Sequence, residues 1–144
     1  MIFDFQKLGS VVMSMVNYIQ MMISEMPADI CRCVATPAAN HLFSIKTTNP
    51  DQLIASDAEV FVHLVMQLLY LAQRTCPDST AVSFLCSHVK APDHDDWKKL
   101  RRVMKYLQGS VDMPLTLFAD GSGYVWWWVD VSSAVHPDMK GHTG

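Results

Sequence analysis

The spacing of apolar residues changes at Gly109, and this change constrains the fold more than any other feature of the chain. Before Gly109, apolar residues recur at the three- and four-residue intervals of a helix face. After it, they follow the two-residue period of a strand. The change predicts a mixed α+β chain, with helices first, strands after them, and a boundary at Gly109.

The clearest helix is predicted over 57–74, with Asp57 as its N-cap. Its continuous apolar stripe consists of Val60, Phe61, Leu64, Leu68 and Leu71. An earlier helix is predicted from Met15 up to Pro27, because apolar residues recur there at helical spacing. Between the two helices, residues 36–53 are predicted to form a loop.

Two further helices come after the clearest one. Pro77 separates it from a helix that runs to Val89. Three residues could cap the start of that helix, namely Asp78, Ser79 or Thr80. The last helix opens at Asp93 and ends at Gln108.

Short strands are predicted at both ends of the chain. Ile2–Phe5 and Val11–Met13 form a strand, a turn and a returning strand. Near the other end, Leu115–Phe118 is predicted to pair with Tyr124–Asp130 as a hairpin, because the loop Asp120–Gly123 has the composition of a tight turn.

Composition narrows the class of protein. The 144 residues include 11 Lys+Arg and 14 Asp+Glu, for a net charge of −3, and 50% of them are hydrophobic. This excludes a disordered chain and argues against a wholly basic protein that coats nucleic acid. The four cysteines have no framework spacing, which fits a reducing compartment. The uncharged stretch 8–24 is too short and too polar to span a membrane, so we expect an intracellular protein without membrane contact.

The last predicted helix has two distinct faces. Its apolar face consists of Trp97, Leu100, Met104 and Leu107. Its basic stripe consists of Lys98, Arg101, Arg102 and Lys105, with Lys99 beside them. Such a stripe could follow nucleic-acid phosphates, although a solvated face is the commoner explanation. Nearby Asp93, Asp95 and Asp96 weaken the local positive field.

Asp130 ends the aromatic strand that contains Trp126 and Trp128 on the same face. A carboxylate at the end of a packed strand could hold a metal ion or act as a base. The alternative is that Asp130 only ends the strand and caps the next segment. The sequence contains no glycine-rich phosphate loop, no Ser-His-Asp order and no nucleophile elbow.

A run of motifs over 68–117 has a specific order: Leu-Tyr-Leu, then Arg74 and Pro77-Asp78, then Ala-Val-Ser-Phe-Leu, Trp-Lys-Lys-Leu and Arg-Val-Met-Lys-Tyr-Leu. This order resembles the end of the reverse transcriptase in the polyprotein of copia-type LTR retrotransposons. Upstream, FDFQKLGSVVMSMVNYI and ATPAANHLF resemble the segment after the palm of that polymerase. Downstream, WWVDVSSAVHPDMKGHTG resembles the first hairpin of the ribonuclease H domain.

The resemblance implies three segments. Residues 1–56 would be the post-palm segment, 57–109 the helical thumb and connection, and 110–144 the incomplete first β-hairpin of a ribonuclease H-like α/β fold. In the family, the thumb grips an RNA–DNA or DNA template–primer duplex by its backbone.

The resemblance also implies roles for single residues. It makes the basic stripe a phosphate-facing surface, consisting of Lys98, Lys99, Arg101, Arg102 and Lys105. It makes Asp130 the first metal-binding carboxylate of a site that uses two Mg²⁺ ions in the intact enzyme.

Departures from the family pattern predict that this chain is inactive by itself. It contains no Tyr-x-Asp-Asp, and the other nuclease carboxylates would come after Gly144. Because Asp130 alone cannot hold two Mg²⁺ ions, we expect a fragment of a polyprotein that does not bind Mg²⁺ firmly. Cys76 and Val131-Ser132 also differ from the residues usual in the family. The alternatives are a residual duplex-binding module and a small helical interaction protein with no nucleic-acid role.

Overall fold

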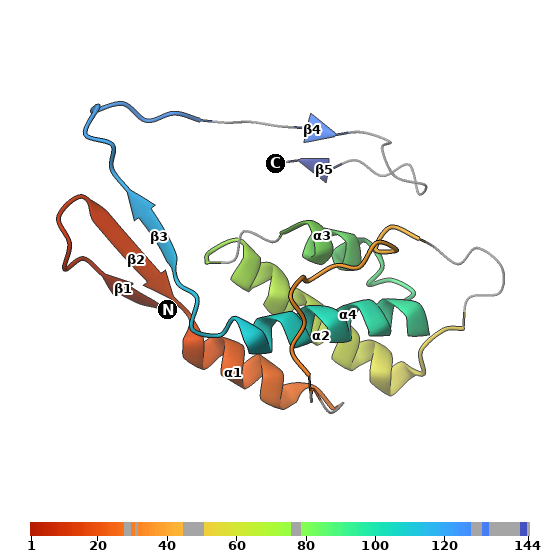
Figure 1. The fold of residues 1–144 in the computed structure, drawn as a ribbon. Helices are drawn as coiled ribbons and strands as arrows, with labels where there is room; N and C mark the ends of the chain where they lie inside the picture. Colours follow the sequence, from red (N-terminus) through yellow and green to blue (C-terminus); the bar gives the residue numbers. More distant parts are fainter. Residues whose placement is uncertain are drawn as a thin grey trace.

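The computed structural model describes residues 1–27, 30, 32–44, 51–75, 79–127, 131–132 and 142–143. Within these residues, four helices pack together and a three-stranded antiparallel sheet lies beside them (Figure 1). The chain is therefore α+β, which confirms the predicted class.

All four described helices were predicted from the sequence within a few residues. They are α1 (Val16–Glu25), α2 (Ala55–Ala72), α3 (Ser79–Ser87) and α4 (His94–Gly109). The predicted cap of α2 is wrong, because Ile54 occupies the N-cap and Asp57 lies in the first turn. There, the carboxylate of Asp57 still favours the positive end of the helix dipole.

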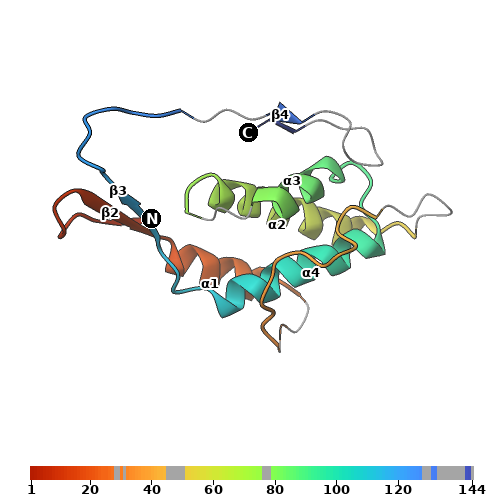
Figure 2. The same ribbon diagram turned by 45° about the horizontal axis from the view of Figure 1, so that its top comes forward.

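The helices enclose one hydrophobic core. Figure 2 shows α2 and α3 as one layer and α1 and α4 as the other, in agreement with their contacts. The predicted α2 stripe is buried except for Val60, which is half-buried. Met22 of α1 and Leu64 of α2 are both fully buried in this core. Residues from the segments 1–56 and 57–109 therefore pack in one core.

The amino-terminal strands form the predicted hairpin. β1 (Ile2–Asp4) and β2 (Ser10–Ser14) pair antiparallel, with Phe3 opposite Met13. The turn between them contains Gly9 at a φ of 76°, in the region that favours glycine. The prediction of a strand, a turn and a returning strand is confirmed.

The predicted carboxy-terminal hairpin is wrong for the described residues. β3 (Leu115–Phe118) pairs antiparallel with β2, and Tyr124 to Trp127 form no strand. The facing pairs are Ser10 with Phe118, Val11 with Leu117, Val12 with Thr116 and Met13 with Leu115. Apolar side chains that face each other across strands stabilise this pairing. Residues 115–118 thus extend the amino-terminal sheet.

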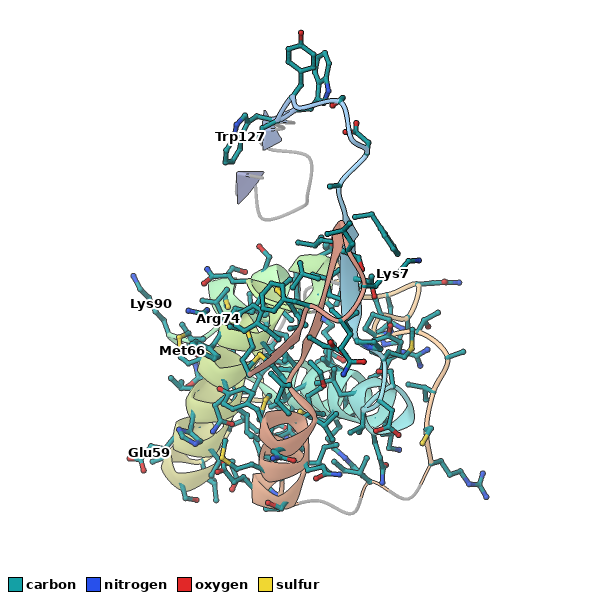
Figure 3. The ribbon with its side chains drawn as sticks, turned by 90° about the vertical axis from the view of Figure 1, so that its left-hand side faces the viewer. Lys7, Glu59, Met66, Arg74, Lys90 and Trp127 are labelled. Atoms are coloured by element: carbon teal, nitrogen blue, oxygen red, sulfur yellow. The ribbon has the colours of Figure 1, made fainter. Side chains whose placement is uncertain are left out.

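The sheet, in the order β1-β2-β3, has no buried face. The residues of β1 are exposed, those of β2 are half-buried, and β3 contains both kinds. Farther along the chain, β4 (Val131–Ser132) pairs with β5 (His142–Thr143). Trp127 lies far from the helices in Figure 3 and is 85% exposed. Large apolar side chains therefore remain uncovered outside the helical core.

By length and composition alone, α2 could cross a membrane, and among the described helices it is the only one that could. Its buried side chains pack against the other helices, whereas Glu59 and Met66 point away from them (Figure 3). This division is typical of a core helix. The expected absence of membrane contact remains a prediction.

Candidate nucleic-acid interface

The basic helix α4 begins with a capping box. The Asp93 carboxylate accepts hydrogen bonds from the backbone N–H groups of Asp95 and Asp96, both at 2.8 Å. In return, Asp96 Oδ2 accepts one from the backbone N–H of Asp93 at 3.1 Å. This reciprocal arrangement satisfies donors that an uncapped helix start leaves open. The predicted first-turn position of Asp96 is confirmed.

Asp96 also joins α4 to the chain after α3. Its Oδ1 lies 2.7 Å from Nδ1 of His88, and both side chains are largely buried. The His88 ring packs against Phe84, with the ring centroids 4.4 Å apart. No local pattern indicates this pair, because the two residues are eight positions apart on different elements.

Four basic side chains lie on one side of α4. Since successive helical residues are about 100° apart, Lys98, Arg101, Arg102 and Lys105 project within an arc of about 100°. Lys98 is exposed and the other three are half-buried. The predicted stripe is therefore present for these four residues.

Lys99 is a correction to the predicted stripe, because it faces inward. Its side chain is 5% exposed, and Nζ donates a hydrogen bond to the Ser44 carbonyl oxygen at 2.8 Å. The same Nζ pairs with Asp95 Oδ2 at 3.0 Å and lies 4.5 Å from the centroid of the Phe84 ring. Lys99 therefore links α4 to Ser44 of the loop and to Phe84 of α3. Its ammonium group is not exposed to a phosphate in solvent.

The carboxylates that were expected to weaken the basic field are all engaged. Asp93 and Asp96 form the capping box, and Asp95 pairs with Lys99. None of the ion pairs within the described part of the chain involves Lys98 or Lys105. Asp93 and Asp96 keep their negative charge in the capping box, so Asp95 is the carboxylate of this group whose charge a cation of α4 balances, in its pair with Lys99.

The loop 36–44 lies against the basic side of α4. Arg102 donates a hydrogen bond from Nη2 to Thr36 Oγ1 at 3.0 Å. Thr36 in turn donates to the Ala38 carbonyl oxygen at 2.9 Å. A hollow of about 160 Å³ lies between the loop and the helix, and it is lined by Pro37, Ala38, Ala39, His41, Leu42, Lys98, Lys99 and Arg102. Sequence reasoning missed Thr36 and His41, since a loop gives no periodic signal.

A second hollow lies between the same loop and α3. It measures about 390 Å³ and is lined by Pro37, Ala38, Ala39, Asn40, Leu42, Phe43, Thr80 and Ala81. No charged side chain lines it. Of the two hollows, only the one beside α4 therefore offers cations to a ligand.

The predicted metal ligand Asp130 lies outside the described residues, as does Trp128. Among the residues that the structure does describe, no group of three or more His, Cys, Asp or Glu side chains could hold a metal ion. The role of Asp130 in holding Mg²⁺ therefore stays a prediction that rests on the resemblance.

Some titratable side chains outside α4 have pKa values shifted from their usual range. Burial, together with the neighbouring charges of Tyr70 and Glu25, raises the pKa of Tyr18, which links α1 to α2 by donating to the Gln67 carbonyl oxygen at 3.4 Å. Burial also raises the pKa of the Cys86 thiol. Hydrogen bonds from Ser122 lower the pKa of the exposed Asp120 carboxyl. None of these groups adjoins the basic side chains.

No protein-family model matches the chain, and no solved structure matches it significantly. A function for this interface is therefore inferred from its geometry and from the sequence.

Proposed function

We propose that this chain is a portion of a copia-type retrotransposon polyprotein, spanning the end of its reverse transcriptase and the start of its ribonuclease H domain. In this proposal the chain itself binds duplex nucleic acid through the outward basic side chains of α4. The observation that carries the proposal is the set of four basic side chains on one side of α4, namely Lys98, Arg101, Arg102 and Lys105.

The proposed partner is an RNA–DNA or DNA duplex, which the chain would contact by its phosphates. Lysine and arginine side chains that neutralise phosphates release condensed counterions, so such binding weakens as salt rises. Contacts of this kind hold a duplex in register and carry little sequence information. In the parent enzyme, the same surface would steady the template–primer for the polymerase and the nuclease.

We also propose that the chain catalyses neither reaction of the parent. Both reactions need Mg²⁺ ions held by several carboxylates, and the sequence offers only Asp130 at a position that matches the family. Purified chain should give no Mg²⁺-dependent primer extension and no RNA cleavage. Either activity, if abolished by Asp130→Asn, would contradict this part of the proposal.

A filter-binding titration with an RNA–DNA duplex at two salt concentrations tests the binding. Affinity should fall at the higher salt, and Arg101→Ala with Arg102→Ala should reduce that fall. Lys90→Ala is a matched control, because Lys90 is an exposed cation that lies apart from α4 in Figure 3. An affinity that does not change with salt, or a salt effect that the double substitution leaves undiminished, would contradict the proposal.

A second candidate is a small interaction protein with no nucleic-acid role. Exposed apolar side chains on the sheet and in its β1–β2 turn favour it, since Phe118 of β3 is 68% exposed, Phe5 in the turn 70%, and Leu8 in the turn fully exposed. Apolar surfaces of this kind commonly mark contacts with other proteins. Size-exclusion chromatography should then give concentration-dependent association that high salt does not weaken. A monomer at all concentrations would exclude this alternative.

A further inference from the structure

We propose that the hollow between the loop 36–44 and α4 binds one phosphoryl group, and that its source is a backbone phosphate of the duplex. The inference that the phosphoryl group comes from a duplex rests on the proposed function. The inference that the hollow binds a phosphoryl group at all rests on the residues that line it. This space, the phosphate hollow, is lined by Pro37, Ala38, Ala39, His41, Leu42, Lys98, Lys99 and Arg102.

The charge of the phosphate hollow suits an anion. Lys98, Lys99 and Arg102 all line it, and the positive charge of Lys99 is balanced by Asp95 at 3.0 Å. Lys98 and Arg102 contribute two positive charges that no ion pair among the described residues neutralises. No carboxylate is among the residues that line the hollow.

Arg102 is held in a fixed position before any ligand arrives. The guanidinium group of Arg102 donates a hydrogen bond to the Thr36 hydroxyl oxygen. The Thr36 hydroxyl is itself held by the hydrogen bond that it donates to the Ala38 carbonyl oxygen. The Nε atom of Arg102 is buried and has no hydrogen-bond partner among the described residues. The planar guanidinium group of Arg102 matches the oxygens of a phosphate.

The size of the phosphate hollow suits a single phosphoryl group. Its volume is about 160 Å³. It is smaller than the roughly 300–1,000 Å³ that is usual for sites that enclose a whole organic ligand. A phosphoryl group therefore fits inside, while the rest of its molecule must remain outside.

The position of the phosphate hollow favours a backbone phosphate. Lys105 lies on the same side of α4 as Lys98, about 10 Å farther along the helix axis. Neither Lys105 nor Arg101 lines the hollow. A strand with one phosphate in the hollow can thus bring a neighbouring phosphate toward these two cations, whereas free phosphate gains nothing from them.

Nuclear magnetic resonance on the full chain tests the proposal with two probes, a 12-base-pair DNA duplex and inorganic phosphate. The duplex should shift the Nε–H resonance of Arg102, and inorganic phosphate should shift it only at much higher concentration. Thr36→Val removes the acceptor that holds Arg102 and should weaken the response. Lys90→Ala, which removes an exposed cation apart from α4, should leave the shift of this resonance unchanged.

A variant that fills the phosphate hollow distinguishes its contribution to duplex binding from that of the other basic side chains of α4. Ala39→Leu fills the space without altering charge, and it should lower the salt slope of duplex binding by about 0.9, the value of one phosphate. Ala38→Leu fills the same hollow from the neighbouring residue and should do the same if Ala39→Leu proves unstable in thermal melting.

Two outcomes would overturn the inference and are distinguishable. If the duplex binds but Ala39→Leu and Ala38→Leu both keep the slope, the hollow plays no part, while the proposed function stands. If inorganic phosphate shifts Arg102 Nε–H but the duplex does not bind, the source is free phosphate. The backbone-phosphate inference and the proposed function then fail together.

Discussion

Lys98 and Lys99 are neighbours in the sequence with opposite surroundings. Lys98 is exposed, whereas the Lys99 side chain is 5% exposed and its ammonium group contacts Ser44 and Asp95. The rotation of about 100° per residue moves Lys99 from the solvent side to the edge of the core. Charge alone therefore does not show which basic residues of a helix can reach a phosphate.

Replacing Lys99 tests this difference. Lys99→Met keeps most of the apolar stem but removes the hydrogen bond to the Ser44 carbonyl oxygen, and it leaves Asp95 without its partner. We expect the free energy of unfolding in urea to fall by about 1–3 kcal/mol. The matched Lys98→Met should change it by less than about 0.5 kcal/mol. Equal losses in the two variants would contradict the inward position of Lys99.

The two described free cysteines should react at different rates. Burial raises the pKa of Cys86, so less of it is thiolate at pH 8, whereas Cys33 is exposed. Iodoacetamide should therefore alkylate Cys33 first, as measured by mass spectrometry of peptides. Because the pKa of Cys86 is raised, its labelling should accelerate as the pH rises above 8. Faster labelling of Cys86 at pH 8 would contradict its burial.

At the scale of elements, local signals were sufficient for the helices but not for the pairing of the strands. Asp93 and Asp96 are three residues apart, so the start of α4 could be read from the sequence. The partner of β3 is more than 100 residues away in β2, and the sequence instead favoured the nearer segment 124–130. Likewise, the contact of Thr36 with Arg102 joins residues 66 positions apart, which no local pattern encodes.

The capping box makes a prediction for α4. Asp93→Ala removes the acceptor for two backbone N–H groups at the helix start. We expect a loss of about 0.5–2 kcal/mol in the free energy of unfolding, measured by urea denaturation. Asp112→Ala, an exposed carboxylate after α4, is the control and should have almost no effect. A loss no larger than that of the control would count against the cap.

The sheet should open more readily than the helices. Because neither of its faces is buried, few apolar contacts resist its local opening. Backbone amides of β2 and β3 should therefore exchange hydrogen faster than those of α2 around Leu64, as measured by mass spectrometry or nuclear magnetic resonance. Equal protection of the two elements would show that the sheet is covered in solution.

At the scale of the whole molecule, one helical core positions both the basic side of α4 and the loop 36–44 beside it. Leu100 and Met104 anchor α4 in that core, and Leu42 anchors the loop. The basic side is therefore presented by a packed body, although the net charge of the chain is −3. The central claim is that this side, and not the chain as a whole, binds a duplex.

A comparison of salt slopes tests this claim most directly. The logarithm of the duplex association constant is measured against the logarithm of salt concentration for three proteins: the unaltered chain, Lys98→Ala with Lys105→Ala, and Lys7→Ala with Lys90→Ala. Each double variant loses two cations, but only the first loses them from α4. The slope should fall by about 1.8 in the first, from about 0.9 for each lost phosphate contact, and stay unchanged in the second. Equal slopes in the two double variants would contradict the claim.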